Sequence, residues 1–244
     1  MLRSYLRTNP VARKLKYFHE LYSEFKLNRY RLLAQRLNSY SKPLVLDVGA
    51  NVGQFATDLY SYGYTGKLIS IEPSRSAYDK LIANCRKYPN WNGHNIAFGD
   101  QDGSQILNVT ANNGLSSSIL EMNEVHVTEF PESHVVEKEE VKVQTLDSFL
   151  SANPELGEVS LLKMDVQGFE KYVILGAQGN ISKIRHCLIE VSLLELYENE
   201  ASLLEIINLL DSNNHKIIDI HRGIKSKSGE LLQVDILTKQ KIQN

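Results

Sequence analysis

The residues best suited to bind a ligand lie in the segment Asp47-Val48-Gly49-Ala50-Asn51-Val52-Gly53, which contains the end of a short apolar run. Its two glycines allow the backbone to approach a ligand closely, because no Cβ stands in the way. A loop that leads from a strand into a helix opens at the carboxyl edge of a parallel sheet, where such folds bind ligands. Glu72 ends the next apolar run, and its carboxylate can accept two hydrogen bonds from a ribose diol. Together the loop and Glu72 predict a site for an adenosine-containing ligand.

The spacing of the two glycines selects among such ligands. A dinucleotide fingerprint reads G-x-G-x-x-G and leaves room for a pyrophosphate at a helix N-terminus. Here the spacing is G-x-x-x-G, and Asp47 lies two residues before the first glycine. An acidic side chain there repels a pyrophosphate but suits the sulfonium and ammonium groups of S-adenosylmethionine. We therefore expect S-adenosylmethionine, and the alternatives are a NAD-type oxidoreductase and a catalytically idle interaction protein that keeps the fold.

A second group of polar residues interrupts two later apolar runs, which we expect to form adjacent strands. Lys163 and Asp165 are two residues apart and so point to the same face of their strand, and Glu190 lies near the end of the next strand. In one interpretation, Asp165 orients or deprotonates an acceptor hydroxyl while Glu190 and Lys163 tune its charge. The alternatives are a Mg²⁺ ion on the two carboxylates, and a structural ion pair between Lys163 and Glu190.

Alternating strands and helices must position these residues. Seven apolar runs predict strands over Leu44–Val48, Leu68–Ile71, His94–Phe98, Val159–Met164, Cys187–Val191, Lys216–Ile220 and Leu231–Leu237. Helical patterns between them predict helices over Gly53–Tyr62, from the N-cap Ser74 to about Lys87, over Gly168–Ala177 and over Leu196–Leu210. This order predicts a Rossmann-like, doubly wound α/β fold with a mostly parallel seven-stranded sheet. A short turn joins the last two strands, so the last strand must be antiparallel, and we expect it at an edge.

Two additional strands, Ser104–Ala111 and Val135–Val143, are expected on either side of a polar stretch. Within it, Asn112–Ser118 is rich in small and polar residues. Such a loop is suited to act as a lid or acceptor loop over a site, and the alternative is an ordinary solvent loop.

The chain resembles the FkbM family of methyltransferases over roughly residues 44–238. The resemblance rests on Leu46–Gly53, Ile71-Glu72-Pro73, Val143–Asp147, Leu162–Glu170, Leu175-Gly176-Ala177, Glu190 and Val234-Asp235. It implies O-methylation of a hydroxyl on a sugar, a glycoconjugate or a natural product. Gln167 departs from the pattern, because the family often has Glu at this position.

The resemblance also implies roles for the cofactor residues. The methionine end of the cofactor is lined by Asp47, Gly49, Ala50, Asn51 and Gly53, and Glu72 holds the ribose. Asp100 is a candidate for binding the adenine amino group. Its alternative interpretation is a turn residue within Gly99–Gly103.

The segment after Met164 excludes two other kinds of acceptor. Many enzymes that methylate exocyclic or amide nitrogens carry an Asn/Asp-Pro-Pro-aromatic clamp here, whereas this chain has Asp165-Val166-Gln167-Gly168. The same loop contains no cysteine, so we do not expect cysteine-mediated methylation of a pyrimidine carbon. Oxygen is therefore the predicted acceptor atom.

Charge divides the chain into a basic helical extension, residues 1–42, and a methyltransferase domain, residues 43–244. Residues 1–40 contain nine Lys or Arg and two Glu, whereas the remaining 204 residues contain 18 Lys or Arg against 27 Asp or Glu. An acidic domain argues against a nucleic-acid substrate. The extension is expected either to pack on the domain or to contact an anionic membrane surface, and a chain starting near Ser41 is expected to fold and bind cofactor.

Cysteine content and hydropathy indicate the compartment. Cys85 and Cys187 belong to no C-x-x-C pair and are interpreted as core thiols in a reducing environment. No apolar run approaches the roughly 20 residues of a membrane span, and no continuous apolar segment marks a secretory signal. We therefore expect a cytoplasmic protein.

Overall fold

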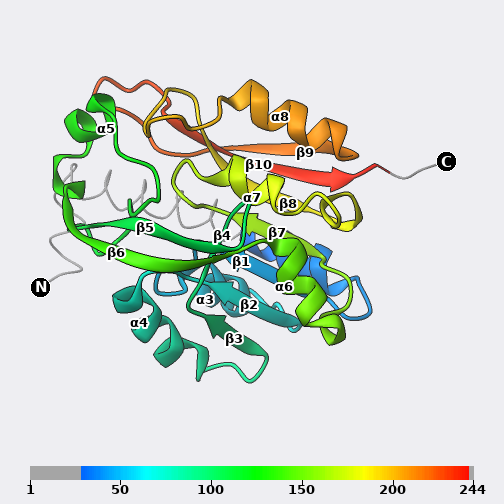
Figure 1. Ribbon diagram of the computed structural model, residues 1–244. Coiled ribbons are helices and arrows are strands. Elements are labelled where there is room, and N and C mark those ends of the chain that lie inside the picture. Colours follow the sequence, from blue (N-terminus) through cyan, green and yellow to red (C-terminus); the bar gives the residue numbers. More distant parts are fainter. Residues whose placement is uncertain (1–28, 242–244) are drawn as a thin grey trace, which may run out of the picture.

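The computed structural model describes residues 29–241, and its main sheet has the strand order β3-β2-β1-β7-β8-β10-β9 (Figure 1). These strands are β1 (Leu44–Val48), β2 (Lys67–Ile71), β3 (Trp91–His94), β7 (Leu161–Met164), β8 (Cys187–Ser192), β9 (His215–Arg222) and β10 (Gln233–Gln240). Neighbouring strands from β3 to β8 are parallel, and β10 is antiparallel to both of its neighbours. The predicted fold, a doubly wound and mostly parallel seven-stranded sheet, is therefore confirmed.

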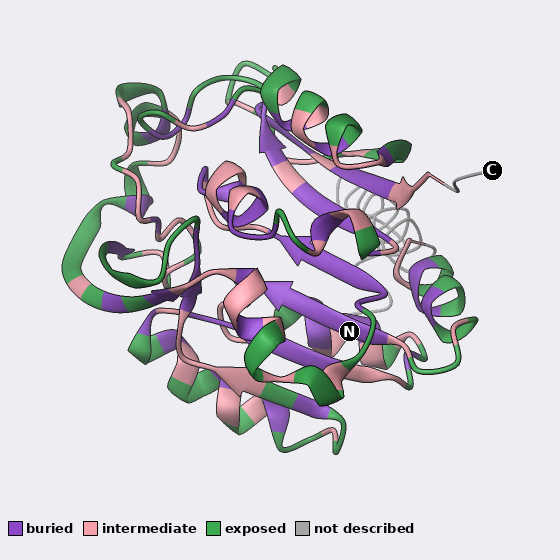
Figure 2. Cartoon of the chain, turned by 45° about the vertical axis from the view of Figure 1, so that its right-hand side comes forward, coloured by how far each residue is buried: buried purple, intermediate pink, exposed green. Residues whose placement is uncertain are grey.

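Helices cover both faces of this sheet. They are α3 (Gln54–Ser61), α4 (Arg75–Cys85), α6 (Leu146–Ala152), α7 (Glu170–Leu175) and α8 (Leu203–Ser212). A further helix, α5 (Glu124–Glu129), contributes to neither core of the sheet, and 3₁₀ turns lie at Pro131–Ser133, Pro154–Leu156 and Ile181–Lys183. One apolar core lies beneath α6, α7 and α8, and the other beneath α3 and α4. Burial on both faces explains why the central strands are apolar runs without a polar side (Figure 2).

The strand β1 contributes to both cores because its side chains alternate between the two faces. Leu46 and Val48 pack in the core beneath α6 and α7, whereas Val45 packs in the opposite core. The alternation places Asp47 on the same face as Val45, where the side chain is fully buried. A carboxylate in that position requires a cationic or hydrogen-bonding partner.

A second sheet of three strands, in the order β4-β6-β5, stands beside the main sheet. It contains β4 (Ala97–Phe98), β5 (Gly103–Thr110) and β6 (Val135–Gln144), which confirms the two additional strands. The prediction of one strand over His94–Phe98 is wrong, because β3 ends at His94 and β4 belongs to the second sheet. Asn95 makes the break, since its side-chain amide donates to the backbone carbonyls of Glu72 (3.0 Å) and Pro73 (2.7 Å).

The helix predicted over Leu196–Leu210 is wrong in its first half. The helix α8 begins after Ser202, which forms a capping box with Glu205 and so satisfies the free N–H groups of the first turn. Before Ser202 the chain is a loop, in which Asn199 has a positive φ of 62°. Tyr197 is fully buried in that loop.

The prediction that the antiparallel strand lies at an edge of the sheet is wrong. β10 inserts between β8 and β9, so β9 forms the edge. The pairing runs from Gln233 opposite Ser192 to Leu237 opposite Leu188. This places the first residues of β10 at the carboxyl end of β8, beside the ligand-binding edge.

A helical segment over residues 29–38 completes the core beneath α3 and α4. Leu33, Ala34 and Leu37 are buried in it, and the hydroxyl of Tyr40 lies 2.9 Å from Nε2 of His186. Residues 29–38 are therefore helical as predicted, whereas residues 1–28 lie outside the described part. Because of this packing, we no longer expect a chain starting at Ser41 to fold.

Leu37→Ala should lower the free energy of unfolding by about 2–5 kcal/mol, because the fully buried side chain leaves a cavity in the core. Leu32→Ala is the matched control, since Leu32 lies in the same segment with 61% of its surface exposed. It should change the free energy of unfolding by less than about 0.5 kcal/mol. Urea unfolding measures the free energy of unfolding of both variants. A loss in Leu37→Ala as small as that in Leu32→Ala would show that the segment adds nothing to the core.

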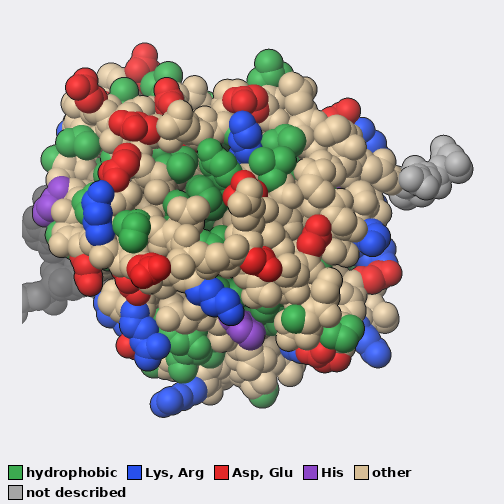
Figure 3. Space-filling view, viewed as in Figure 1, with side chains coloured by type: hydrophobic (Ala, Val, Ile, Leu, Met, Phe, Trp, Pro, Cys, Tyr) green, Lys and Arg blue, Asp and Glu red, His purple; other side chains and the backbone are tan. Residues whose placement is uncertain are grey.

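Within residues 29–241, no helix is both long and apolar enough to cross a membrane. Cys85 and Cys187 are buried free thiols. On the face drawn in Figure 3, acidic and basic side chains are interspersed.

Candidate active site

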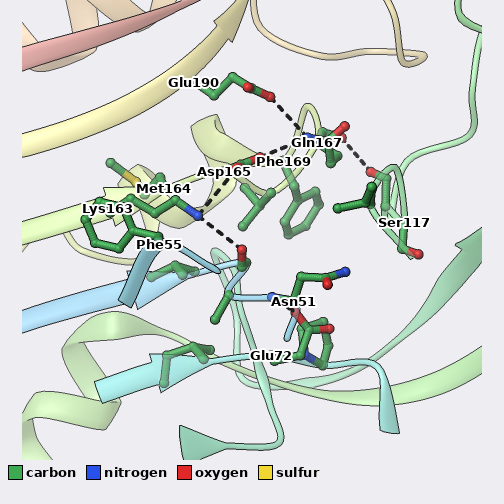
Figure 4. Close-up of a pocket in the computed structure, with 18 of the residues that line it drawn as sticks. Asn51, Phe55, Glu72, Ser117, Lys163, Met164, Asp165, Gln167, Phe169 and Glu190 are labelled. Carbon is green, nitrogen blue, oxygen red and sulfur yellow. Dashed lines mark hydrogen bonds and ion pairs between the residues drawn. The ribbon is translucent and has the colours of Figure 1, made fainter. Parts of the chain in front are cut away.

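A cavity of about 410 Å³ opens where β1, β2, β7 and β8 reach the carboxyl edge of the sheet (Figure 4). Its volume lies in the range of small-molecule and cofactor sites. The walls come from the ends of these strands, from the second sheet, from the start of β10 and from the start of the helical segment 29–38. Among the predicted site residues, the cavity is lined by Gly49, Ala50, Asn51, Glu72, Lys163, Asp165 and Glu190.

The glycines of the β1–α3 loop have two different functions. Gly49 has a φ of +74°, and a Cβ on it would lie 1.8 Å from the backbone oxygen of Asp165. Only glycine therefore allows the cofactor loop to contact the loop after β7. Gly53 has a φ of +88° and begins α3 behind the cavity, where a Cβ would lie 2.5 Å from the ring of Trp91.

Glu72 is held in place at the end of β2 by backbone donors. Its Oε2 accepts from the N–H of Asn51 (2.7 Å), and its Oε1 accepts from the N–H of Ser74 (2.9 Å). Burial raises the pKa of Glu72 to about 7, although both N–H groups act to lower it. A carboxylate has about four acceptor positions, so two remain for the hydroxyls of a ribose.

The cavity is apolar beside Glu72. Pro73 follows Glu72 in the chain and lines the cavity. Apolar lining residues from the second sheet and from the loop after β7 are Ala97, Phe98, Leu107 and Phe169. Apolar walls next to a carboxylate with free acceptor positions are suited to an adenine base and a ribose, which agrees with the predicted role of Glu72 without testing it.

Lys163 is the cationic partner of the buried carboxylate of Asp47. Its Nζ lies 3.2 Å from Oδ1 of Asp47 and 3.4 Å from Oδ2 of Asp165, and it donates to the backbone oxygen of Gly49 (3.1 Å). Burial acts to lower the pKa of Lys163, but the carboxylates of Asp165 and Asp47 raise it above its usual value. The ion-pair partners of Lys163 are thus these two aspartates, which corrects the alternative interpretation that paired Lys163 with Glu190.

Gln167 connects the two remaining carboxylates of the site. Its Nε2 donates to Oδ1 of Asp165 (2.8 Å) and to Oε1 of Glu190 (3.1 Å), while its Oε1 accepts from the hydroxyl of Tyr197 (2.8 Å). Figure 4 shows Asp165 between Lys163 and Gln167. The side chain at this position both donates and accepts hydrogen bonds. A glutamine can do both, whereas an ionised glutamate could only accept and would add a negative charge beside Asp165 and Glu190.

Glu190 also accepts from Nε2 of Gln233 (2.9 Å). Burial raises the pKa of Glu190 well above its usual value, and the nearby carboxylates of Asp165 and Asp235 raise it further. The ionised form of Glu190 is therefore disfavoured beside these two carboxylates.

The loop Asn112–Ser118 lies over the cavity. Gly114, Leu115 and Ser117 line it, and the side-chain amide of Asn51 donates to the backbone oxygen of Asn113 (3.1 Å). The hydroxyl of Tyr197 donates to the backbone oxygen of Ser116 (3.0 Å). These contacts favour the lid or acceptor-loop interpretation over that of a solvent loop.

Some predicted site residues lie outside the cavity. Asp47 and Gly53 do not line it and lie behind its wall, and Asp100 is exposed at a turn. Conversely, Arg29 and Tyr30 line the cavity although the sequence assigned them only to the extension. Asp235 lines it as well.

Within residues 29–241, no group of three or more His, Cys, Asp or Glu side chains has the arrangement of a metal site. The pair considered for Mg²⁺, Asp165 and Glu190, is bridged by the amide nitrogen of Gln167. A donor between the two carboxylates occupies the position that a cation would need.

Glu72→Ala should weaken binding of S-adenosylhomocysteine, measured by calorimetry, by about 1.5–3 kcal/mol for each charge-assisted hydrogen bond lost. In the unaltered protein the affinity should fall as the pH drops below about 7. The ionised carboxylate of Glu72 accepts the hydrogen bonds from the ribose, so below its pKa of about 7 it must first lose a proton before the ligand binds. The variant should lose this pH dependence. Glu137→Ala, an exposed carboxylate on β6, is the control, and an unchanged affinity in Glu72→Ala would refute the ribose assignment.

A doubly wound sheet with an inserted antiparallel strand, a glycine loop after β1 and a carboxylate at the end of β2 define a class I methyltransferase. The chain belongs to the FkbM methyltransferase family, whose methyltransferase FkbM domain matches residues 47–217.

Comparisons with known proteins agree with this assignment. The 2-O-methyltransferase NoeI of Sinorhizobium fredii (strain NBRC 101917 / NGR234) is 28% identical over 176 residues, which cover 70% of this chain and 72% of NoeI. The structure of methyltransferase FkbM from Methylobacillus flagellatus KT has a TM-score of 0.51 and 16% identity over 80% of this chain, which spans only 43% of that protein. Magnesium protoporphyrin IX methyltransferase from Synechocystis PCC 6803, solved with bound SAM, has a TM-score of 0.50 and 10% identity over 96% of this chain and 85% of that one. The two structures share the fold.

Proposed function

We propose that this protein transfers the methyl group of S-adenosylmethionine to a hydroxyl oxygen of a sugar, a glycoconjugate or another small acceptor. The observation that carries the proposal is the position of Asp165. Its carboxylate lines the cavity, is 35% exposed, and is held between Lys163 and Gln167 beside the glycine loop. A fixed and accessible carboxylate next to the cofactor loop is suited to orient a hydroxyl and accept its proton.

The cofactor residues define where the acceptor must lie. Glu72 and the apolar residues beside it bind the adenosine part, and the loop from Gly49 to Asn51 faces the methionine part. When bound, S-adenosylmethionine supplies a methyl group on a sulfonium, which an acceptor oxygen displaces in line. The acceptor is therefore bound over β7 and β8, where Asp165 and Glu190 lie.

The neighbours of Asp165 prepare it for this function. Nζ of Lys163 lies 3.4 Å from its Oδ2, and Gln167 fixes the orientation of its Oδ1 through a hydrogen bond of 2.8 Å. Burial raises the pKa of Glu190 well above its usual value, so a second negative charge next to Asp165 is disfavoured. Orientation of the acceptor and removal of its proton are the two contributions that the protein makes to such a displacement.

Two observations support oxygen as the acceptor atom. The loop after β7 reads Asp165-Val166-Gln167-Gly168 and lacks the proline-aromatic clamp of many nitrogen methyltransferases. The relative NoeI is named a 2-O-methyltransferase. The identity between the two chains is 28%, so the acceptor of this protein has to be determined directly.

Calorimetry with S-adenosylmethionine, S-adenosylhomocysteine and NAD tests the cofactor. Binding of NAD alone would overturn the proposal in favour of an oxidoreductase. Transfer of a labelled methyl group to pairs of acceptors that differ only in a hydroxyl or an amine then tests the acceptor atom. Label on the amine only would refute O-methylation, and absence of transfer to every acceptor would favour an idle protein. Loss of transfer in EDTA would restore the Mg²⁺ interpretation.

A further inference from the structure

We propose that Arg29 and Asp235 form the outer wall of an acceptor subsite that binds an uncharged, polyhydroxylated ring. This inference rests on the proposed function, because it places the acceptor in the part of the cavity that the cofactor leaves free. Both side chains line the cavity, and Nη1 of Arg29 lies 2.7 Å from Oδ2 of Asp235.

The antiparallel direction of β10 brings Asp235 to this position. Asp235 lies directly opposite Glu190, so both side chains point to the same face of the sheet. Glu72 ends β2, which is four strands away from β10 in the order β2-β1-β7-β8-β10. With neighbouring strands about 4.8 Å apart, Asp235 and Glu72 lie roughly 19 Å from each other across the edge. The ribose carboxylate and the Arg29–Asp235 pair thus mark opposite ends of the cavity.

The pair is built to bind hydroxyl groups. The two side chains are 22% and 21% exposed, so the pair is largely shielded from water. A guanidinium carries five N–H donors, of which one carboxylate pairs with at most two. Donors and acceptors are therefore presented together, and a vicinal diol both donates and accepts hydrogen bonds.

Aromatic side chains line the cavity next to the pair. The rings of Tyr30 and Phe55 have their centroids 5.8 Å apart, and both line the cavity. Burial raises the pKa of Tyr30 above its usual value, so it remains a neutral phenol. A sugar-type ring presents C–H groups on its faces and hydroxyls at its edge, which matches aromatic walls beside polar groups.

The charges favour an uncharged ring. Each cation that lines the cavity, Lys163 and Arg29, already has a carboxylate partner. An anionic acceptor would approach the carboxylates of Asp165 and Asp235, and contact between like charges disfavours its binding. Arg29 and Tyr30 lie outside residues 47–217, which match the family.

Saturation-transfer NMR on the complex with S-adenosylhomocysteine tests the proposal. The probes are the methyl glycosides of glucose, galactose and mannose, compared with the methyl glycoside of glucuronic acid. At least one neutral glycoside should bind, and more tightly than the uronic acid. Arg29→Ala and Asp235→Asn should each weaken that binding about tenfold or more, as expected for a lost charge-assisted hydrogen bond.

Arg36→Ala is the matched control, because Arg36 is exposed on the same helical segment. It should leave glycoside binding unchanged. The affinity for S-adenosylhomocysteine should stay within about twofold in all three variants, which separates loss of the subsite from loss of folding. Failure of every neutral glycoside to bind, preference for the uronic acid, or binding unaffected by both Arg29→Ala and Asp235→Asn would overturn the inference. If the unaltered protein binds no S-adenosylhomocysteine, the proposed function itself fails.

Discussion

Asp165→Asn is expected to lower kcat for methyl transfer by about 10²–10⁴-fold, the usual contribution of general acid–base catalysis. The substitution keeps the shape of the side chain and its contact with the amide of Gln167, but it removes the charge that accepts a proton. The cofactor contacts of Glu72 and of the β1–α3 loop do not involve this carboxylate. Steady-state rates with a labelled methyl donor, together with calorimetry on S-adenosylhomocysteine, measure the two effects separately.

Asp79→Asn provides the control, because Asp79 is exposed on α4 and pairs with the exposed Arg75 one turn earlier in the same helix. It should leave kcat, cofactor affinity and melting temperature unchanged. Asp165→Asn should also leave the melting temperature nearly unchanged, since the side chain is partly exposed and its partner Lys163 keeps Asp47. Full activity in Asp165→Asn would exclude Asp165 as the proton acceptor and leave it a structural partner of Lys163.

The parts of the site that the sequence predicted depend on short-range geometry. The β1–α3 loop and Glu72 were predictable because each follows directly from a strand end. The common face of Lys163 and Asp165 follows from the two-residue period of a strand. The partner of Lys163 was not predictable in this way, because it depends on the register between strands. Asp47 lies directly opposite Lys163 on β1, whereas Leu188 lies opposite it on β8 and Glu190 comes two residues later.

Other features depended on contacts between distant segments. Leu196 and Tyr197 fit the helical period of Leu203–Leu210. They are instead buried in the loop that precedes Ser202, and the capping box at Ser202 starts the helix there. Arg29 reaches Asp235 across more than 200 residues of sequence, and no local pattern relates the two. The predicted boundary at residue 43 remains an expectation based on charge.

The inserted β10 shows how one topological detail changes the site. Had the antiparallel strand been at the edge, as the short turn suggested, Asp235 would lie away from Glu190. Its insertion adds a carboxylate to the row formed by Asp165 and Glu190, and it raises the pKa of Glu190 together with burial. The acceptor side of the cavity is thus determined by strand order, which the sequence left open.

Lys163→Met is expected to lower the free energy of unfolding by about 3–5 kcal/mol, the cost of breaking a buried ion pair by removing one partner. Methionine fills a similar volume, so the loss reflects charge more than packing. Asp165 is partly exposed and can be hydrated, but Asp47 has no exposed surface and would be left as an uncompensated charge. Chemical unfolding followed by circular dichroism measures the change.

The double substitution Asp47→Asn with Lys163→Met should recover most of that loss, because it removes both charges together. The pH dependence gives a second criterion. Without Lys163, burial keeps the pKa of Asp47 above its unfolded value, so the folded state binds its proton more tightly than the unfolded chain does. The loss caused by Lys163→Met should therefore be small in acid and increase as the pH rises towards that raised pKa. A loss that is the same at pH 5 and pH 8, and that Asp47→Asn does not reverse, would mean that Lys163 stabilises the sheet through packing of its methylene chain and not through its charge.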